Sequence, residues 1–151
     1  WHKMMCRKIG LFGEENEDEK LIKDLLEWMH INKADYTNTF LSLMNRDIKK
    51  ENSFQNPPFA GWFKRWNARL EKNNKSLEMS LQLMSENNPL VIPRNHKVEE
   101  SLEAASNEAN LKPLHNLLKY LKKPYEKQKG ISDFQIVSET YGKTYKTFCG
   151  T

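Results

Sequence analysis

Apolar residues recur at intervals of three and four along most of this 151-residue chain, and short polar or proline-containing segments separate the runs. This spacing places the apolar side chains of each run on one side of an α-helix. Seven such runs follow one another, over residues 1–9, 21–29, 36–44, 59–70, 77–84, 95–105 and 114–121. The pattern predicts an all-α fold, an irregular bundle of about six or seven helices.

Residues that favour helix ends stand at the borders of several runs. Asp35 and Ser76 precede two of them, where a side-chain oxygen can accept a hydrogen bond from the first turn. Pro57 and Pro58 open another run, at positions where the missing N–H of proline has little cost. Asn110 is predicted to cap the last helix. The buried face of that helix is predicted to comprise Leu114, Leu117, Leu118 and Leu121.

The helical pattern fades after Tyr125, which divides the chain into a helical domain, residues 1–125, and a poorly structured basic tail, residues 126–151. The formal net charge of +4 is unevenly spread, because residues 111–151 hold 8 Lys/Arg and 3 Asp/Glu. A basic segment of this kind can attract RNA or an acidic protein face. A solvated lysine-rich surface is the simpler explanation.

No sequence motif for a catalytic site is present. Phosphate-binding glycine loops, dinucleotide-binding glycine patterns, zinc-protease motifs and serine-hydrolase motifs are all missing from the sequence. The four histidines, His2, His30, His96 and His115, are scattered, and none has another histidine three or four positions away. The sequence therefore predicts no catalytic, cofactor-binding or metal-binding residue in this chain.

Two short motifs have both a functional and a structural interpretation. The alternation of aromatic and basic residues over residues 62–66 could stack bases and hold phosphates. Helical spacing, however, puts Trp62 and Trp66 on one face and turns Lys64 and Arg65 away, as in an ordinary amphipathic helix. The cluster over residues 94–96, Arg-Asn-His, could hold an anion, but a capping arrangement with an Arg–Glu pair needs no ligand.

The two cysteines, Cys6 and Cys149, are too few for a disulfide framework and favour a reducing, cytoplasmic compartment. No signal peptide and no apolar run of about 20 residues is visible. Cys6 lies among apolar residues and is predicted to serve packing. Cys149 lies in the tail close to Lys143 and Lys146, where a thiol ionises more easily, although an unremarkable terminal cysteine is the simpler interpretation. A first residue of Trp1 predicts a fragment of a longer protein.

Several segments match, in order, the C-terminal region of a known family. They are Arg7-Lys8-Ile9-Gly10-Leu11, Ala34-Asp35-Tyr36-Thr37-Asn38-Thr39-Phe40, Trp62 to Trp66 with Arg69-Leu70, Asn88-Pro89 with Ile92, Arg94 and Asn95, residues 114–125, and Cys149-Gly150-Thr151. On these segments the chain resembles the selenoprotein O family of protein adenylyltransferases. It departs from the family at His96, where many members have an aromatic residue, and at Gly150-Thr151, which replaces a commoner pair of serines.

The resemblance implies a larger enzyme with a protein-kinase-like (pseudokinase) fold that binds ATP in an inverted pose. Members transfer AMP to hydroxyl groups of proteins with the help of a divalent metal such as Mg²⁺. The catalytic, nucleotide-binding and metal-binding residues of the family belong to the preceding domain. The position of Cys149 is that of selenocysteine in animal members, which makes Cys149 the candidate redox residue. Bacterial members are expected in the cytoplasm and eukaryotic relatives in mitochondria.

The expected role is therefore that of a helical accessory domain, whose partners are the catalytic domain of the parent enzyme and its protein substrates. Neither a membrane nor a nucleic acid is an expected partner. Cys149 is expected to form a reversible disulfide with a cysteine of the catalytic domain. The alternative is a free-standing helical binding module whose basic tail holds RNA or an acidic protein.

Overall fold

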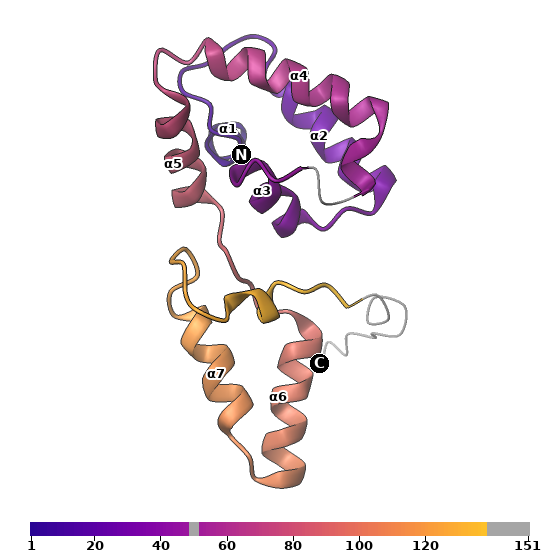
Figure 1. Cartoon of the computed structure of the whole chain (residues 1–151), viewed down its shortest axis with the longest axis vertical. Helices are drawn as coiled ribbons and strands as arrows, with labels where there is room; N and C mark the ends of the chain where they lie inside the picture. The colour runs from indigo at the N-terminus through magenta and orange to yellow at the C-terminus, as the bar shows by residue number, and fades with distance from the viewer. Residues whose placement is uncertain (49–51, 139–151) are drawn as a thin grey trace. The chain divides into compact units, whose positions relative to one another are not determined.

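The computed structural model describes residues 1–48 and 52–138, and Figure 1 shows their arrangement as helices joined by short connections. The elements are α1 (His2–Lys8), α2 (Asp18–Asn32), α3 (Tyr36–Met44), η1 (Asn52–Gln55), α4 (Pro57–Glu71), α5 (Leu77–Asn87), α6 (Asn95–Glu108), α7 (Lys112–Leu121) and η2 (Ile131–Phe134). The described ranges contain no strand, so the predicted all-α fold is confirmed.

The chain divides into two compact units, residues 1–89 and residues 90–151. The sequence predicted a different border, at residue 125, where the basic tail begins. Because residues 139–151 of that tail lie outside the described residues, the division at residue 125 stays a prediction.

Helix α4 supplies the centre of the core in the first unit. It lies along α2 (Figure 1) and buries most of the predicted apolar stripe, Phe59, Trp62, Trp66 and Leu70. The rings of Trp62 and Trp66 stack with centroids 5.6 Å apart. The indole N–H of Trp62 donates to the carbonyl of Leu21, and that of Trp66 to the carbonyl of Ile9, each at 2.8 Å. Because both N–H groups have acceptors, these large rings are buried without an unsatisfied donor.

Side-chain caps fix where three helices of this unit begin. Asp35 accepts a hydrogen bond from the backbone N–H of Asn38 at 2.8 Å, and Ser76 accepts one from Met79 at 3.2 Å. Both predicted caps are thereby confirmed. Asn56, which was not predicted as a cap, caps α4 in the same way.

The second unit is a hairpin of α6 and α7, joined by a turn in which Ala109 has φ of 52°. Tyr120 of α7 lies against Phe134 of η2, with ring centroids 4.6 Å apart, and donates from its hydroxyl to the carbonyl of Lys129 at 2.9 Å. Gly130, with φ of 83°, follows that carbonyl, and a Cβ there would lie 2.9 Å from the Tyr120 hydroxyl. A glycine therefore allows residues 126–134 to fold back onto α7.

Two predictions about α7 were wrong in detail. Leu118 was predicted to be buried but is 42% exposed, while Leu117 is buried. The reason is that α6, the main packing partner of α7, and the η2 segment leave the Leu118 side of α7 uncovered. Asn110 was predicted to be the cap, but the N-cap position belongs to Leu111, and Asn110 accepts a hydrogen bond from the N–H of Lys112 at 3.1 Å.

Within the described ranges, no helix has both the length and the apolar character needed to cross a membrane.

Candidate functional site

The most elaborate polar arrangement in the described part of the chain is a buried ion pair between Asp18 and Arg69. Nε of Arg69 donates to Oδ1 of Asp18 at 2.6 Å, and Nη2 donates to Oδ2 at 3.0 Å. The Asp18 side chain is fully buried and that of Arg69 is 8% exposed. Such two-pronged contact fixes both the distance and the orientation of the two groups.

Asn73 and Ser80 complete this arrangement. We call the four residues Asp18, Arg69, Asn73 and Ser80 the Asp18–Arg69 cluster. Nη1 of Arg69 donates to Oδ1 of Asn73 at 2.8 Å. Nδ2 of Asn73 donates to Oγ of Ser80 at 2.9 Å and to the carbonyl of Gly10 at 2.8 Å. The cluster thus connects the start of α2, the end of α4, α5 and the loop after α1.

The loop after α1 approaches the cluster closely because residue 10 is a glycine. Gly10 has φ of 73°, in the left-handed region that residues with a Cβ seldom adopt. A Cβ at this position would lie 2.9 Å from the carbonyl oxygen of Ser80 and 3.1 Å from Cγ of Met84. Gly10 therefore permits both the turn and the contact with α5.

No sequence motif marks the Asp18–Arg69 cluster as a unit. Asp18 was not singled out, and Arg69 entered only through the family resemblance. The available signal was the register of α4: Trp62, Trp66, Arg69 and Asn73 follow one another at intervals of four, three and four. An arginine in the register of a buried stripe requires a buried carboxylate, which Asp18 supplies.

The chemistry of the cluster is that of a closed network rather than a reactive site. Nη2 of Arg69 also donates to the carbonyl of Phe12 at 3.1 Å, and Oδ2 of Asp18 also accepts from the N–H of Glu15 at 2.9 Å. A groove of about 470 Å³ passes beside it, but its rim arginine, Arg65, is paired with Asp24 at 2.7 Å. The charged groups are committed to one another, so the cluster orients helices and has no reactive group to offer a substrate.

A second hollow, of about 370 Å³, lies beside α1 and contains the only cysteine within the described residues. Cys6 is buried, and its Sγ lies 3.7 Å from Nε2 of His2. Burial raises the pKa of the Cys6 thiol, and the charge of Asp18 raises it further, while Arg69 acts in the opposite direction. The thiol therefore stays protonated near neutral pH, and the predicted packing role of Cys6 is confirmed.

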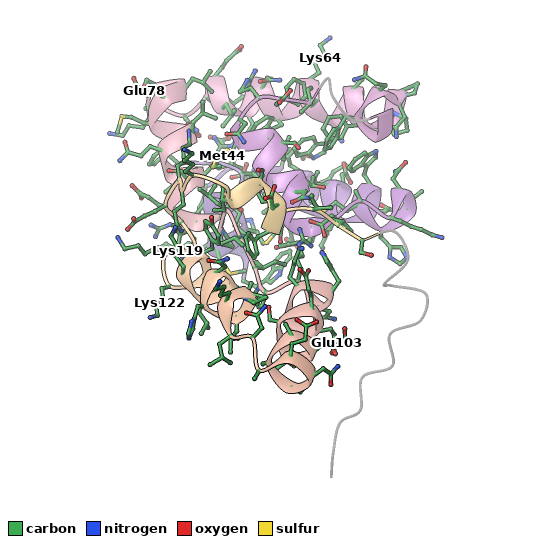
Figure 2. The ribbon with its side chains drawn as sticks, turned by 60° about the horizontal axis from the view of Figure 1, so that its bottom comes forward. Met44, Lys64, Glu78, Glu103, Lys119 and Lys122 are labelled. Carbon is green, nitrogen blue, oxygen red and sulfur yellow. The ribbon has the colours of Figure 1, made fainter. Side chains whose placement is uncertain are left out.

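The aromatic and basic segment over residues 62–66 has the predicted geometry. Trp62 and Trp66 are buried, whereas Lys64 and Arg65 are exposed, and Figure 2 shows Lys64 pointing away from the helices. The two indole rings are enclosed in the core and cannot stack on bases.

The cluster over residues 94–96 lies at the start of α6, as predicted. Arg94 occupies the N-cap position without a side-chain cap. Burial lowers the pKa of His96, and the positive charges of Lys97 and Arg94 lower it further. The imidazole is therefore neutral at pH 7 and adds no charge for binding an anion.

Cys149, the candidate redox residue, lies outside the described residues, so its role stays a prediction. Within the described residues, no three His, Cys, Asp or Glu side chains come together in a way that could hold a metal ion.

Comparison with known proteins assigns the chain to a family. The family model described as "Protein adenylyltransferase SelO" matches residues 1–122. The chain belongs to this family. The SelO match includes the whole Asp18–Arg69 cluster and the hairpin of α6 and α7.

Curated relatives of this SelO-family chain carry the name "Protein nucleotidyltransferase YdiU". The proteins from Alcanivorax borkumensis and Nitrosococcus oceani are each 45% identical over all 151 residues, and the protein from Pelagibacter ubique is 44% identical over the same length. The chain spans 31% of the length of each of these relatives.

Proposed function

We propose that this chain is the C-terminal helical domain of a protein nucleotidyltransferase that transfers AMP from ATP to hydroxyl groups of proteins. The SelO-family match over residues 1–122 carries the proposal. The name of the relatives, protein nucleotidyltransferase, agrees with it. In the parent protein, ATP and Mg²⁺ would be held by the catalytic domain, and we assign no residue of this chain to catalysis or to either ligand.

The domain would support the catalytic domain rather than take part in the reaction. The closed network of the Asp18–Arg69 cluster is consistent with a rigid support, because its charges are satisfied internally. The first unit also exposes apolar side chains that a neighbouring domain would cover: Trp1 (65% exposed), Met4 (50%), Leu77 (48%) and Met79 (44%).

The test compares the whole parent protein with this chain alone. Each is incubated with Mg²⁺ and ATP labelled on the α-phosphate, and label on protein is detected after gel electrophoresis. Parallel samples with ATP labelled on the γ-phosphate distinguish AMP transfer from phosphate transfer. We expect α-label with the whole protein only. Absence of label from the whole protein, under both reducing and oxidising conditions, would contradict the proposal.

We further propose that Cys149 regulates the parent enzyme through a reversible disulfide. Two thiols would join as one S–S bond, and their two electrons and two protons would pass to an oxidant such as glutathione disulfide, which leaves as two glutathione thiols. The expected result is that Cys149→Ser makes AMP transfer insensitive to glutathione disulfide. Cys6→Ser is the matched control and should leave the sensitivity unchanged, because Cys6 is buried. Equal sensitivity in all three proteins would refute the disulfide.

The charge of residues 111–151 favours one alternative, a helical module whose basic tail binds RNA or an acidic protein. This segment holds 8 Lys/Arg against 3 Asp/Glu. The alternative predicts that the chain binds RNA and that the logarithm of the binding constant falls linearly with the logarithm of the salt concentration. The proposed role as a domain of a protein nucleotidyltransferase predicts little binding of this kind.

A further inference from the structure

The hairpin of α6 and α7 exposes apolar side chains on both of its helices. On α6, Leu102 is 51% exposed; at the start of α7, Leu111 is 48% exposed, and Leu118 is 42% exposed. On α7 these residues belong to a stripe at helical spacing, completed by the half-buried Leu114 and Leu121. The stripe is separate from the side of α7 that faces the interior, which carries Leu117 and Tyr120.

The exposed residues of the two helices share one face of the hairpin. Leu102 directly follows the buried Ser101, and Leu118 directly follows the buried Leu117. Each exposed leucine is therefore rotated by about 100° from the buried side of its helix, in the same sense. Because the short turn at residues 109–111 makes the helices antiparallel, equal rotations bring both leucines to the same face.

The two edges of this face carry opposite charges. On α6 the acidic residues Glu99 and Glu103 border Leu102, and on α7 the basic residues Lys119 and Lys122 border Leu118. Figure 2 shows Lys119 and Lys122 on the side of α7 away from α6, and Glu103 on the outer side of α6. The ion pairs Lys97–Glu100 and Lys123–Glu126 also lie in this unit, and neither involves these edge residues.

We propose that this face binds a second copy of the same chain. A two-fold axis parallel to the helices would lay α6 of each copy on α7 of the other, antiparallel, as in a four-helix bundle. Leu102 and Leu118 of both copies would meet in the centre. The same rotation would place the acidic edge of each copy on the basic edge of the other, at both sides of the contact.

The pairing of charges favours a second copy over other occupants. RNA or an anionic membrane would match the edge with Lys119 and Lys122, but the edge with Glu99 and Glu103 would repel either one. A contact of about 15–20 Å along the helices and about 20 Å across buries on the order of 1,000 Å² in total, which is near the lower limit for a specific interface. The dimer is therefore expected to dissociate in the micromolar range.

Sedimentation equilibrium of the full 151-residue chain tests this proposal, over concentrations from about 1 to 100 µM. The monomer has a mass of 17.9 kDa, and we expect the mean mass to rise toward twice that value. Two double variants each reverse the charge of one edge: Lys119→Glu with Lys122→Glu, and Glu99→Lys with Glu103→Lys. Each should weaken self-association by roughly tenfold or more. An equimolar mixture of the two variants should associate again, because one has two acidic edges and the other two basic edges.

The control is Lys33→Glu with Lys64→Glu, which changes the net charge equally at exposed positions of the first unit and should leave the dimer intact. Leu102→Ser with Leu118→Ser should abolish association at low and high salt alike, with helix content checked by circular dichroism. A monomer at every concentration would overturn the proposal. So would a mixture of edge variants that stays monomeric, or a control that dissociates as much as they do.

Discussion

Arg69 places two guanidinium nitrogens on the two carboxylate oxygens of Asp18, at 2.6 and 3.0 Å, in a region that excludes solvent. Removing two charges from water is costly, and their attraction repays that cost only when the geometry is good and the remaining donors are satisfied. The geometry is good here, and Asn73 and the carbonyl of Phe12 accept two of the three remaining guanidinium hydrogens. The pair thereby fixes how the ends of α2 and α4 meet.

Breaking this pair from one side should be far more damaging than removing it altogether. Arg69→Met or Asp18→Asn alone leaves one buried charge, and each should lower the free energy of unfolding by about 3–5 kcal/mol. The double variant should cost clearly less than the sum of the two. Urea unfolding followed by tryptophan fluorescence measures this, since all four tryptophans lie within residues 1–89. Arg65→Met is the control and should cost at most about 1 kcal/mol, because its pair with Asp24 is exposed. Additive effects of Asp18→Asn and Arg69→Met would contradict a coupled pair.

Three glycines in the first unit should respond differently to alanine. Gly61 lies inside α4 with open space around it, so Gly61→Ala should stabilise the unit by about 0.5–1 kcal/mol. Gly13 has φ of 71° and open space, so its substitution should cost about 1–2 kcal/mol. Gly10→Ala should cost the most, because a Cβ there also meets the carbonyl of Ser80. The order of the three urea midpoints is the observable, and a Gly10→Ala protein as stable as Gly13→Ala would show that α5 moves aside easily.

The hydrogen bond from Trp66 to the carbonyl of Ile9 should contribute to stability beyond the packing of the ring. Trp66→Phe leaves that buried carbonyl without its donor and opens space beside Trp62, so we expect a loss of about 2–4 kcal/mol. Trp1→Phe is the control and should change stability by less than about 0.5 kcal/mol, because Trp1 is 65% exposed. Thermal unfolding of the first unit, followed by circular dichroism, compares the two. A loss no larger than that of Trp1→Phe would mean that water replaces the indole N–H.

The starts of α3 and α5 could be predicted because their signals are local. Asp35 and Ser76 each accept a hydrogen bond from a residue three positions further along the chain, so the cap and its partner lie in the same short stretch of sequence. The exposure of the Leu118 side chain could not be predicted in this way. Periodicity identifies the apolar side of a helix, but it does not say how many neighbours cover that side. In α7 the packed side includes Leu117, while Leu118 stays exposed.

The candidate site shows the same limit. The pairing of Asp18 with Arg69 joins residues far apart in the chain, and nothing local to either residue names its partner. Only the helical register of Arg69, among aromatic residues of the predicted stripe, could have signalled that a carboxylate lies opposite. The family, in contrast, could be identified from the sequence, because several short segments match the family in the same order along the chain.

The thiol of Cys6 should be protected in the folded chain and reactive in the unfolded one. Its pKa is raised from 9.0 by burial, so at pH 8 to 9 the folded chain holds a smaller thiolate fraction than the unfolded chain does. The folded state therefore keeps its proton while the unfolded state loses it, and the free energy of unfolding should fall as the pH rises above 9.0. Alkylation with iodoacetamide, in a Cys149→Ser background so that only Cys6 reports, should be at least about a hundredfold slower in buffer than in urea at pH 8. Equal rates in buffer and in urea would show that α1 opens readily and that Cys6 is not held in the core.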